Sequence, residues 1–212
     1  MRNFFKWLYI GCGLLIILLV VCLRSLPDGN LHVRAMDIGQ GDASLITMPT
    51  SERILVDGGP DDKVIYELSR WMPFYEKTID MVILTHPHAD HVNGLIEVLK
   101  RYQVKNVLMA GVEYKSAGYA AFLEEIYQRK IPVIFATGNN DFQLGTAIID
   151  MLFPFNSTQG QSFVNIHGSS IVFRLIYGKN IFLFTDDMEA EKENELIRAN
   201  LDLKSDFLKV GH

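Results

Sequence analysis

Hydrophobic residues are distributed very unevenly along this chain of 212 residues. From Trp7 to Leu23 they form a run of 17 residues without a charged side chain, and basic residues flank the run on both sides. As an α-helix, a run of this length spans roughly 25 Å, close to the hydrocarbon core of a bilayer. The polar stripe that marks a helix packed on a soluble core is missing from it. The pattern therefore predicts one transmembrane helix over residues 1–24.

This predicted helix is either a permanent anchor or a signal peptide that is removed. The residues at the end of the run, Val20–Arg24, are bulky or charged, so they offer no small-residue cleavage site. We therefore favour an uncleaved anchor in the cell membrane. Because basic residues stay on the cytoplasmic side, Arg2 and Lys6 predict a single-pass protein with a cytoplasmic N-terminus and the remaining chain outside.

After a polar linker at residues 25–30, residues 31–212 show short hydrophobic runs typical of one folded domain. Three close-set runs at 31–36, 44–48 and 53–56 predict a β-meander or hairpins. Helical periodicity then alternates with short hydrophobic runs, and a hairpin, a charged helix and a last short strand follow. This order predicts an α+β domain whose helices cover the outer faces of sheets. The chain ends two residues after the last predicted strand, so we expect a fold that is incomplete at its C-terminus.

Charge and cysteine content narrow the chemistry of this domain. Beyond residue 24 there are 17 basic and 25 acidic residues, a formal charge of −8, so the sequence shows no broad basic surface for nucleic acid. Both cysteines, Cys12 and Cys22, lie in the hydrophobic run. We therefore expect no disulfide-linked partner, and any metal in the domain must be bound by His, Asp or Glu.

Three of the six histidines and one aspartate fall within the six residues 86–91, between a hydrophobic run and a predicted helix. Loops at the carboxyl ends of strands are where α/β sheets bind their ligands. His86 and His88 leave an extended loop on the same side, and Asp90 and His91 can face them across a small cavity. Imidazole and carboxylate groups at this density suit two metal ions held close together. The alternative is a polar turn whose histidines only cap the next helix.

The segment reads T-H-x-H-x-D-H, and in this respect the domain resembles the metallo-β-lactamase-fold hydrolases. Further segments resemble, in the same order, motifs of the soluble domain of ComEC-type DNA-internalisation (competence) proteins: Met36–Ala43, Val56–Gly59, Asn165–Phe173, Phe184–Asp187 and Leu208–His212. The resemblance covers nearly all of residues 31–212. It implies an αββα sandwich, in agreement with the predicted order of strands and helices.

The resemblance also implies a role for each matching residue. His86 and His88 match ligands of a first metal ion. Asp90 and His91 match ligands of a second ion, and Asp187 matches a carboxylate that bridges the two. The alternative for Asp187 is an N-cap of the helix that follows. The preceding residue is also an aspartate, where the family usually has glycine.

Five further residues are weaker candidates. His167 either completes the first metal site or lies exposed in a polar loop, and His212 either binds the second metal or is simply the chain end. Asp57 resembles a buried carboxylate that orients the metal-binding loop without touching metal. Asp37 and Asp42 flank a glycine-rich loop that either lines the mouth of the site or forms a plain hairpin.

Together these features predict a membrane-anchored hydrolase that uses water activated by two divalent metal ions. The ligand set favours Zn²⁺, with Mn²⁺ or Fe as alternatives, and Asp90 is also the candidate catalytic proton acceptor. By resemblance, the expected substrate is a phosphodiester, either nucleic acid or an envelope component. Two alternatives stay open: a hydrolase of another ester, amide or lactone, and a non-catalytic remnant with an incomplete second metal site.

Overall fold

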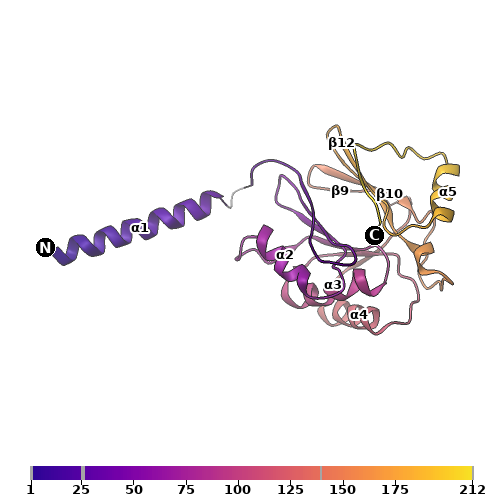
Figure 1. Ribbon diagram of the computed structural model, residues 1–212, viewed down its shortest axis with the longest axis horizontal. Coiled ribbons are helices and arrows are strands. Elements are labelled where there is room, and N and C mark those ends of the chain that lie inside the picture. The colour runs from indigo at the N-terminus through magenta and orange to yellow at the C-terminus, as the bar shows by residue number, and fades with distance from the viewer. Residues whose placement is uncertain (1, 25–26, 139, 212) are drawn as a thin grey trace.

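The computed structural model describes residues 2–24, 27–138 and 140–211 and begins with a long, separate helix. Helix α1 (Arg2–Arg24) projects away from the rest of the chain (Figure 1). Its segment Asn3–Cys22 is long and apolar enough to span a membrane, and none of that segment is buried in the protein. By length and composition, α1 therefore fits the predicted transmembrane helix.

Two β-sheets form the centre of the remaining chain. The first has six strands in the order β1-β2-β3-β5-β7-β8. Their bounds are His32–Ala35 (β1), Ser44–Thr47 (β2), Arg53–Val56 (β3), Met81–Leu84 (β5), Val107–Met109 (β7) and Val133–Phe135 (β8). Strands β1 to β3 form an antiparallel meander, and β3, β5, β7 and β8 run parallel. The predicted opening meander is therefore correct.

The second sheet has five strands in the order β13-β12-β11-β10-β9. Their bounds are Phe142–Leu144 (β9), Ala147–Phe153 (β10), Val172–Tyr177 (β11), Asn180–Phe184 (β12) and Phe207–Lys209 (β13). The strands are antiparallel except for β13, which pairs parallel to β12. A separate two-stranded parallel sheet is formed by β4 (Thr78–Ile79) and β6 (Gln103–Val104).

Helices cover the outer faces of both sheets (Figure 1). Helices α2 (Lys63–Trp71), α3 (Ala89–Arg101) and α4 (Ala117–Arg129) lie on the first sheet, and α5 (Ala190–Arg198) lies on the second. A short 3₁₀ helix, η1 (Ile166–Ser169), lies in the connection between β10 and β11. The four layers confirm the predicted αββα sandwich.

Successive hydrophobic residues of β2, β3, β5 and β7 belong to different hydrophobic cores. On β2, Leu45 packs with the helices of the outer layer, whereas Ile46 packs against the second sheet. On β3, Leu55 likewise packs with the helices, and Ile54 packs against the second sheet. Because side chains alternate across a strand, a sheet that is covered on both faces needs continuous hydrophobic runs. This is why these strands appear in the sequence as uninterrupted runs.

The loop after β3 is held tightly against helix α3. A Cβ atom on Gly94 would lie 1.9 Å from the carbonyl oxygen of Gly58, and one on Gly58 would lie 2.6 Å from the amide nitrogen of Leu95. Two main-chain hydrogen bonds join the segments, from Gly94 N to Gly59 O (3.0 Å) and from Gly58 N to His91 O (2.8 Å). Glycine at these positions lets the two backbones touch, and the contact places Asp57 beside the first turn of α3.

We expect Gly94→Ala to lower the free energy of unfolding by about 1–3 kcal/mol, because the added methyl group must displace the main chain of Gly58. This is the net loss, after subtraction of the gain of about 1 kcal/mol that alanine usually brings inside a helix. Urea unfolding of the full chain in detergent measures the difference. Gly138→Ala is the matched control, since its Cβ would have no neighbour closer than 3.5 Å. Equal midpoints for the two variants would contradict the close contact.

Candidate metal centre

The histidine-rich segment begins at the carboxyl end of β5 and enters helix α3, which starts at Ala89. Asp90 and His91 therefore belong to the first turn of α3, and His88 occupies its N-cap position. The His88 side chain makes no capping hydrogen bond. The structure therefore does not support the alternative in which His88 only caps the helix.

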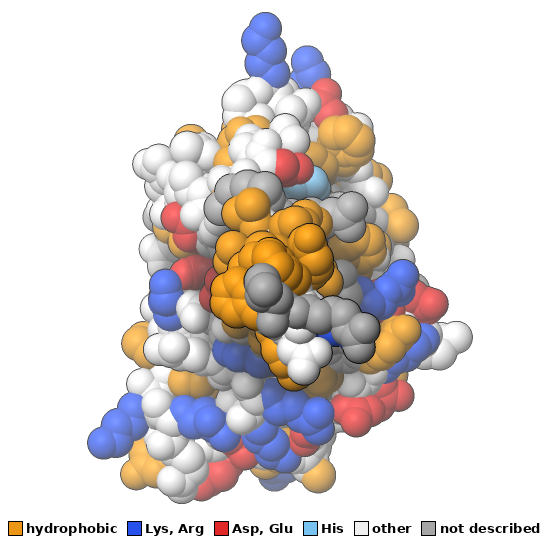
Figure 2. Space-filling model, turned by 90° about the vertical axis from the view of Figure 1, so that its left-hand side faces the viewer, with side chains coloured by type: hydrophobic (Ala, Val, Ile, Leu, Met, Phe, Trp, Pro, Cys, Tyr) orange, Lys and Arg blue, Asp and Glu red, His pale blue; other side chains and the backbone are white. Residues whose placement is uncertain are grey.

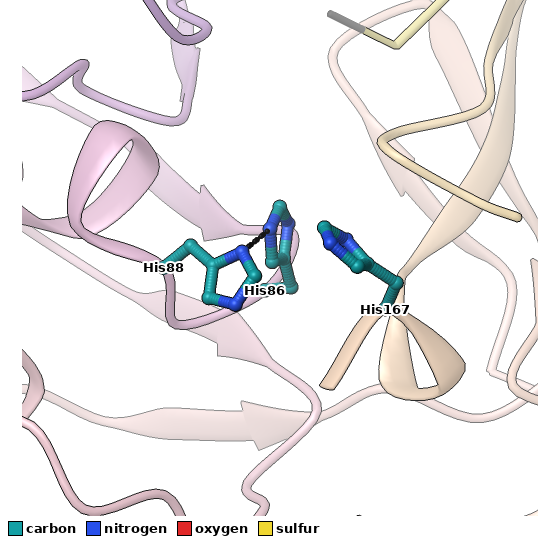
Figure 3. Close-up of side chains that lie close together, drawn as sticks. All are labelled: His86, His88 and His167. Carbon is teal, nitrogen blue, oxygen red and sulfur yellow. Dashed lines mark hydrogen bonds between the residues drawn. The ribbon is translucent and has the colours of Figure 1, made fainter. Parts of the chain in front are cut away.

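Three imidazole rings converge at this edge of the sandwich (Figure 3). His86, His88 and His167 each contribute one ring nitrogen, and these three nitrogens lie within 4.8 Å of one another. His167 is carried by η1, on a connection far from the other two in sequence. Its ring centroid lies 5.0 Å from that of His86 and 4.6 Å from that of His88. The structure thus brings His167 to the first predicted site instead of leaving it in an exposed loop.

The spacing of these rings fits a shared cation. His86 Nε2 and His88 Nδ1 lie 3.0 Å apart. Two nitrogens bound to one tetrahedral Zn²⁺ at 2.0–2.1 Å would be separated by about 3.3 Å. In addition, Nδ1 of His167 is buried and has no hydrogen-bond partner. Since buried polar atoms are nearly always satisfied, this nitrogen fits a role as a metal ligand.

A second group of ligand atoms adjoins the first. Atoms of His86, His91 and Asp187 also lie within 4.8 Å of one another, so His86 belongs to both groups. His91 Nε2 lies 3.3 Å from Asp187 Oδ2 and 4.0 Å from Asp90 Oδ2. It is buried and makes no well-formed hydrogen bond. The His91 imidazole with the carboxylates of Asp187 and Asp90 therefore fits a second cation beside the first.

Asp187 lies in the loop between β12 and α5, and it does not cap that helix. The N-cap of α5 is Glu189, whose side chain makes no capping hydrogen bond. The Asp187 side chain is mostly buried, with 11% exposed, and it faces His91. The structure thus contradicts the N-cap alternative for Asp187 and places its carboxylate where it could bind a cation together with His91.

Two buried carboxylates hold the other sides of the imidazole rings. His91 Nδ1 lies 3.0 Å from Asp57 Oδ2, and His86 Nδ1 lies 3.1 Å from both oxygens of Asp186. The Thr85 hydroxyl lies between the carboxylates, 2.6 Å from Asp57 and 2.7 Å from Asp186. A carboxylate that accepts from Nδ1 leaves Nε2 free to bind a cation. Asp57 thus occupies the orienting position that the sequence suggested.

The orienting position of Asp186 was missed by the sequence analysis, which noted only an aspartate where the family usually has glycine. Asp186 has a φ of +54°, in the left-handed region that glycine adopts readily and aspartate tolerates better than most residues. This backbone conformation turns its side chain inwards, where it is fully buried. The available signal was an acidic residue in place of glycine beside the expected ligand Asp187.

Burial and charge shift the pKa values of these groups in different directions. Burial raises the pKa of Asp57. Burial also opposes ionisation of Asp186, but hydrogen bonds and charge from His86, with His91 and Thr85, outweigh it and lower its pKa. Burial lowers the pKa of His91, yet Asp57 and Asp187 outweigh this effect and raise it to about 11. His88 has a lowered pKa because of burial and the neighbouring imidazoles.

Of the remaining predicted site residues, Asp42 borders the site and Asp37 does not. Asp42 accepts a hydrogen bond from Lys209 Nζ at 2.6 Å, and its main-chain nitrogen donates to the carbonyl of Asp90 at 3.2 Å, so it borders the site. Asp37 does not: its side chain is 82% exposed and pairs with Lys63 at 3.3 Å. The two aspartates flank the same loop, but only one points inwards. His212 lies outside the described residues.

The fold and this cluster of histidines and aspartates together define the class of the protein. The metallo-β-lactamase superfamily model matches residues 36–204, and the chain belongs to this superfamily. ComE operon protein 3 of Bacillus subtilis is 26% identical over 223 residues, which cover 96% of this chain and 27% of that protein. The chain thus spans about a quarter of the length of this curated relative. These matches confirm the resemblance inferred from the motifs.

Solved structures with the same fold include enzymes of different kinds. Metallo-β-lactamase SMB-1 superimposes with a TM-score of 0.54 and 18% identity, covering 84% of this chain and 76% of its own. A metallo-β-lactamase variant from Cronobacter sakazakii gives 0.53 and 14%, with 84% and 76% covered. CmlA, a diiron β-hydroxylase from Streptomyces venezuelae, gives 0.50 and 16%, with 84% and 34% covered. At these identities the likeness defines the fold alone.

We expect Asp186→Ala to weaken metal binding by about 10–100-fold, because His86 loses the carboxylate that orients its ring. Asp186→Asn keeps an oxygen that can accept the Nδ1 hydrogen, and we expect a smaller loss. Competition with a chromogenic chelator measures the affinities. Asp37→Ala, which removes an exposed aspartate, is the control and should bind metal as the unaltered chain does. Unchanged affinity in Asp186→Ala would show that the carboxylate does not position the ligand.

We also expect metal binding at pH 7 to release at least one proton. With its pKa raised to about 11, His91 is protonated in the metal-free protein, and a cation must displace the Nε2 hydrogen. Apparent affinity should therefore rise as the pH increases towards that value. Calorimetry in buffers of different ionisation enthalpy measures the released proton. His91→Ala should lose this proton, and His32→Ala, which removes a histidine paired with Asp28, should keep it. A binding heat that is independent of the buffer would refute this expectation.

Proposed function

We propose that this superfamily hydrolase is anchored to the cell membrane by α1 and cleaves phosphodiesters with the help of two divalent cations. One observation carries the proposal: two adjoining groups of candidate ligand atoms meet here, in which Nδ1 of His167 is buried without a hydrogen bond and His91 Nε2 faces the Asp187 carboxylate at 3.3 Å. A structural hydrogen-bond network alone would not leave the His167 nitrogen unpaired.

The ligand atoms divide between two sites. His86, His88 and His167 would hold the first cation, and Asp90, His91 and Asp187 would hold the second. When bound, such a pair supplies a water of lowered pKa and polarises the scissile group of the substrate. The donors contain no sulfur, and they suit Zn²⁺, with Mn²⁺ or Fe as alternatives.

The residues of the chain have separate tasks in this mechanism. Asp57 and Asp186 hold the rings of His91 and His86, so the ligand atoms do not have to reorganise during the reaction. Asp90 lies at the rim of the site with 31% of its side chain exposed. It is therefore placed to accept the proton of the attacking water and to exchange it with solvent.

The substrate class rests on two observations. The motifs resemble those of DNA-internalisation proteins, which supports a phosphodiester. The formal charge of −8 beyond residue 24 disfavours tight binding along an extended duplex. We therefore propose that the substrate is held mainly at the metal centre and not along a basic groove. With α1 in the membrane and its basic N-terminal residues in the cytoplasm, hydrolysis would take place on the outer side.

Hydrolysis of bis-p-nitrophenyl phosphate by the full chain in detergent, with Zn²⁺ or Mn²⁺, tests the proposal. We expect metal-dependent cleavage that a chelator abolishes and that His88→Ala lowers at least about 100-fold, because the first cation loses a ligand. His32→Ala, a substitution away from the site, should retain full activity. Nitrocefin is assayed in parallel, as a probe of amide hydrolysis. Cleavage of nitrocefin alone, or of neither compound, would contradict a phosphodiesterase.

A further inference from the structure

Exposed aromatic side chains gather in one short segment of the domain. Among the described residues after α1, the exposed aromatic side chains are Tyr66, Trp71, Phe74, Tyr75, Tyr127 and Phe207. Four of these six lie within residues 66–75, at α2 and in the turn that follows it. Phe74 is 82% exposed, and its ring packs edge to face on that of Tyr75 with centroids 5.3 Å apart. Such a concentration of exposed rings indicates an interaction surface.

Guanidinium groups accompany these rings. Arg34, from β1, lies 4.8 Å from the centroid of the Trp71 ring, and Arg70 lies 5.7 Å from it. Arg70 is also paired with Glu67 at 2.8 Å, so Arg34 is the cation more available to an outside partner. Aromatic rings combined with basic groups are typical of residues at the interface between a bilayer and water.

The position of this surface along the chain limits what can cover it. A pocket of the domain is lined by Pro27 together with Trp71 and Pro73. Helix α1 ends at Arg24, and three residues span at most about 11 Å. The Trp71 surface therefore lies close to the end of α1. In Figure 1, α2 is on the side of the domain that faces α1, and Figure 2, which views this side along α1, shows Lys and Arg side chains beside and below the helix, with Asp and Glu side chains among them.

We propose that the surface formed by Arg34, Trp71, Phe74 and Tyr75 docks on the lipid bilayer that α1 spans. The rings would lie in the interfacial layer, and the Arg34 guanidinium would contact lipid phosphates. A folded partner is disfavoured because a small domain is about 30 Å across, more than the length of chain between α1 and this surface allows. The proposal rests on membrane anchoring by α1, and it adds that the domain lies against the membrane in one orientation.

Fluorescence quenching of Trp71 tests this docking directly. The chain has two tryptophans, so Trp7→Phe leaves Trp71 as the single reporter. The full chain is reconstituted in vesicles of phosphatidylcholine and phosphatidylglycerol that carry a nitroxide on the headgroup or deep in the acyl chain. We expect the headgroup nitroxide to quench Trp71 at least about twofold more strongly than the deep nitroxide, as for an interfacial residue. Quenching by aqueous iodide should fall relative to the same protein in urea.

Paired substitutions test whether the neighbouring rings hold Trp71 at the interface. Phe74→Asp with Tyr75→Asp should reduce headgroup quenching, because both side chains are exposed and their replacement removes the proposed lipid contact together with the contact between the two rings. Tyr127→Asp is the matched control: this ring is 77% exposed on α4, and its loss should leave quenching unchanged. Equal effects of both changes, or a Trp71 that iodide quenches freely in vesicles, would overturn the docking.

Failure of anchoring can be distinguished from failure of docking in the same samples. Flotation of the vesicles after an alkaline carbonate wash reports whether α1 is inserted. Chain that floats while Trp71 stays accessible to iodide refutes the docked surface and leaves the anchor intact. If the carbonate wash removes the chain from the vesicles, α1 is not inserted. This result refutes the anchor and also the docking that depends on it.

Discussion

The convergence of buried imidazoles and carboxylates at one edge of the sandwich is the constraint on which this site depends. His86 Nε2 and His88 Nδ1 are hydrogen-bonded at 3.0 Å, His91 Nε2 lies 3.3 Å from Asp187 Oδ2, and Nδ1 of His167 is buried without a hydrogen bond. An unpaired buried group such as the His167 nitrogen costs about 1–3 kcal/mol. A cation would reverse the sign of this contribution, because the same nitrogen would become a ligand. Under the proposed function, metal binding and the stability of the domain would therefore be coupled.

The sandwich assembles this centre from three connections. The loop after β5 brings the first histidines, η1 brings His167, and the loop after β12 brings Asp186 and Asp187. The hydrophobic core between the two sheets sets the distance between these loops. Asp57 and Asp186 then fix the ring orientations from behind, with the Thr85 hydroxyl between them. The positions of the ligand atoms are thus determined by packing and by a layer of buried acids, before any cation is bound.

The proposed membrane contacts would restrict the position of the metal centre relative to the bilayer. A hydrophobic helix, a short connection and an aromatic surface beside that connection would together limit how the domain can turn relative to the bilayer. A tethered domain on a flexible linker samples many orientations, whereas one that also rests on lipid samples few. The restriction would keep the metal centre at a constant height above the membrane, which favours substrates that are themselves close to that surface.

Local patterns in the sequence determined the elements and the first half of the site. The charge-free run predicted α1, continuous hydrophobic runs predicted strands buried on both faces, and the density of ligands at residues 86–91 predicted the metal loop. Neither the position of His167 nor the choice between Asp37 and Asp42 could be read from the sequence, because these depend on how distant loops meet. The same holds for Asp186, whose left-handed backbone turns its carboxylate towards His86. Periodicity is a local property of the chain, whereas the convergence of side chains arises only when the two sheets pack together.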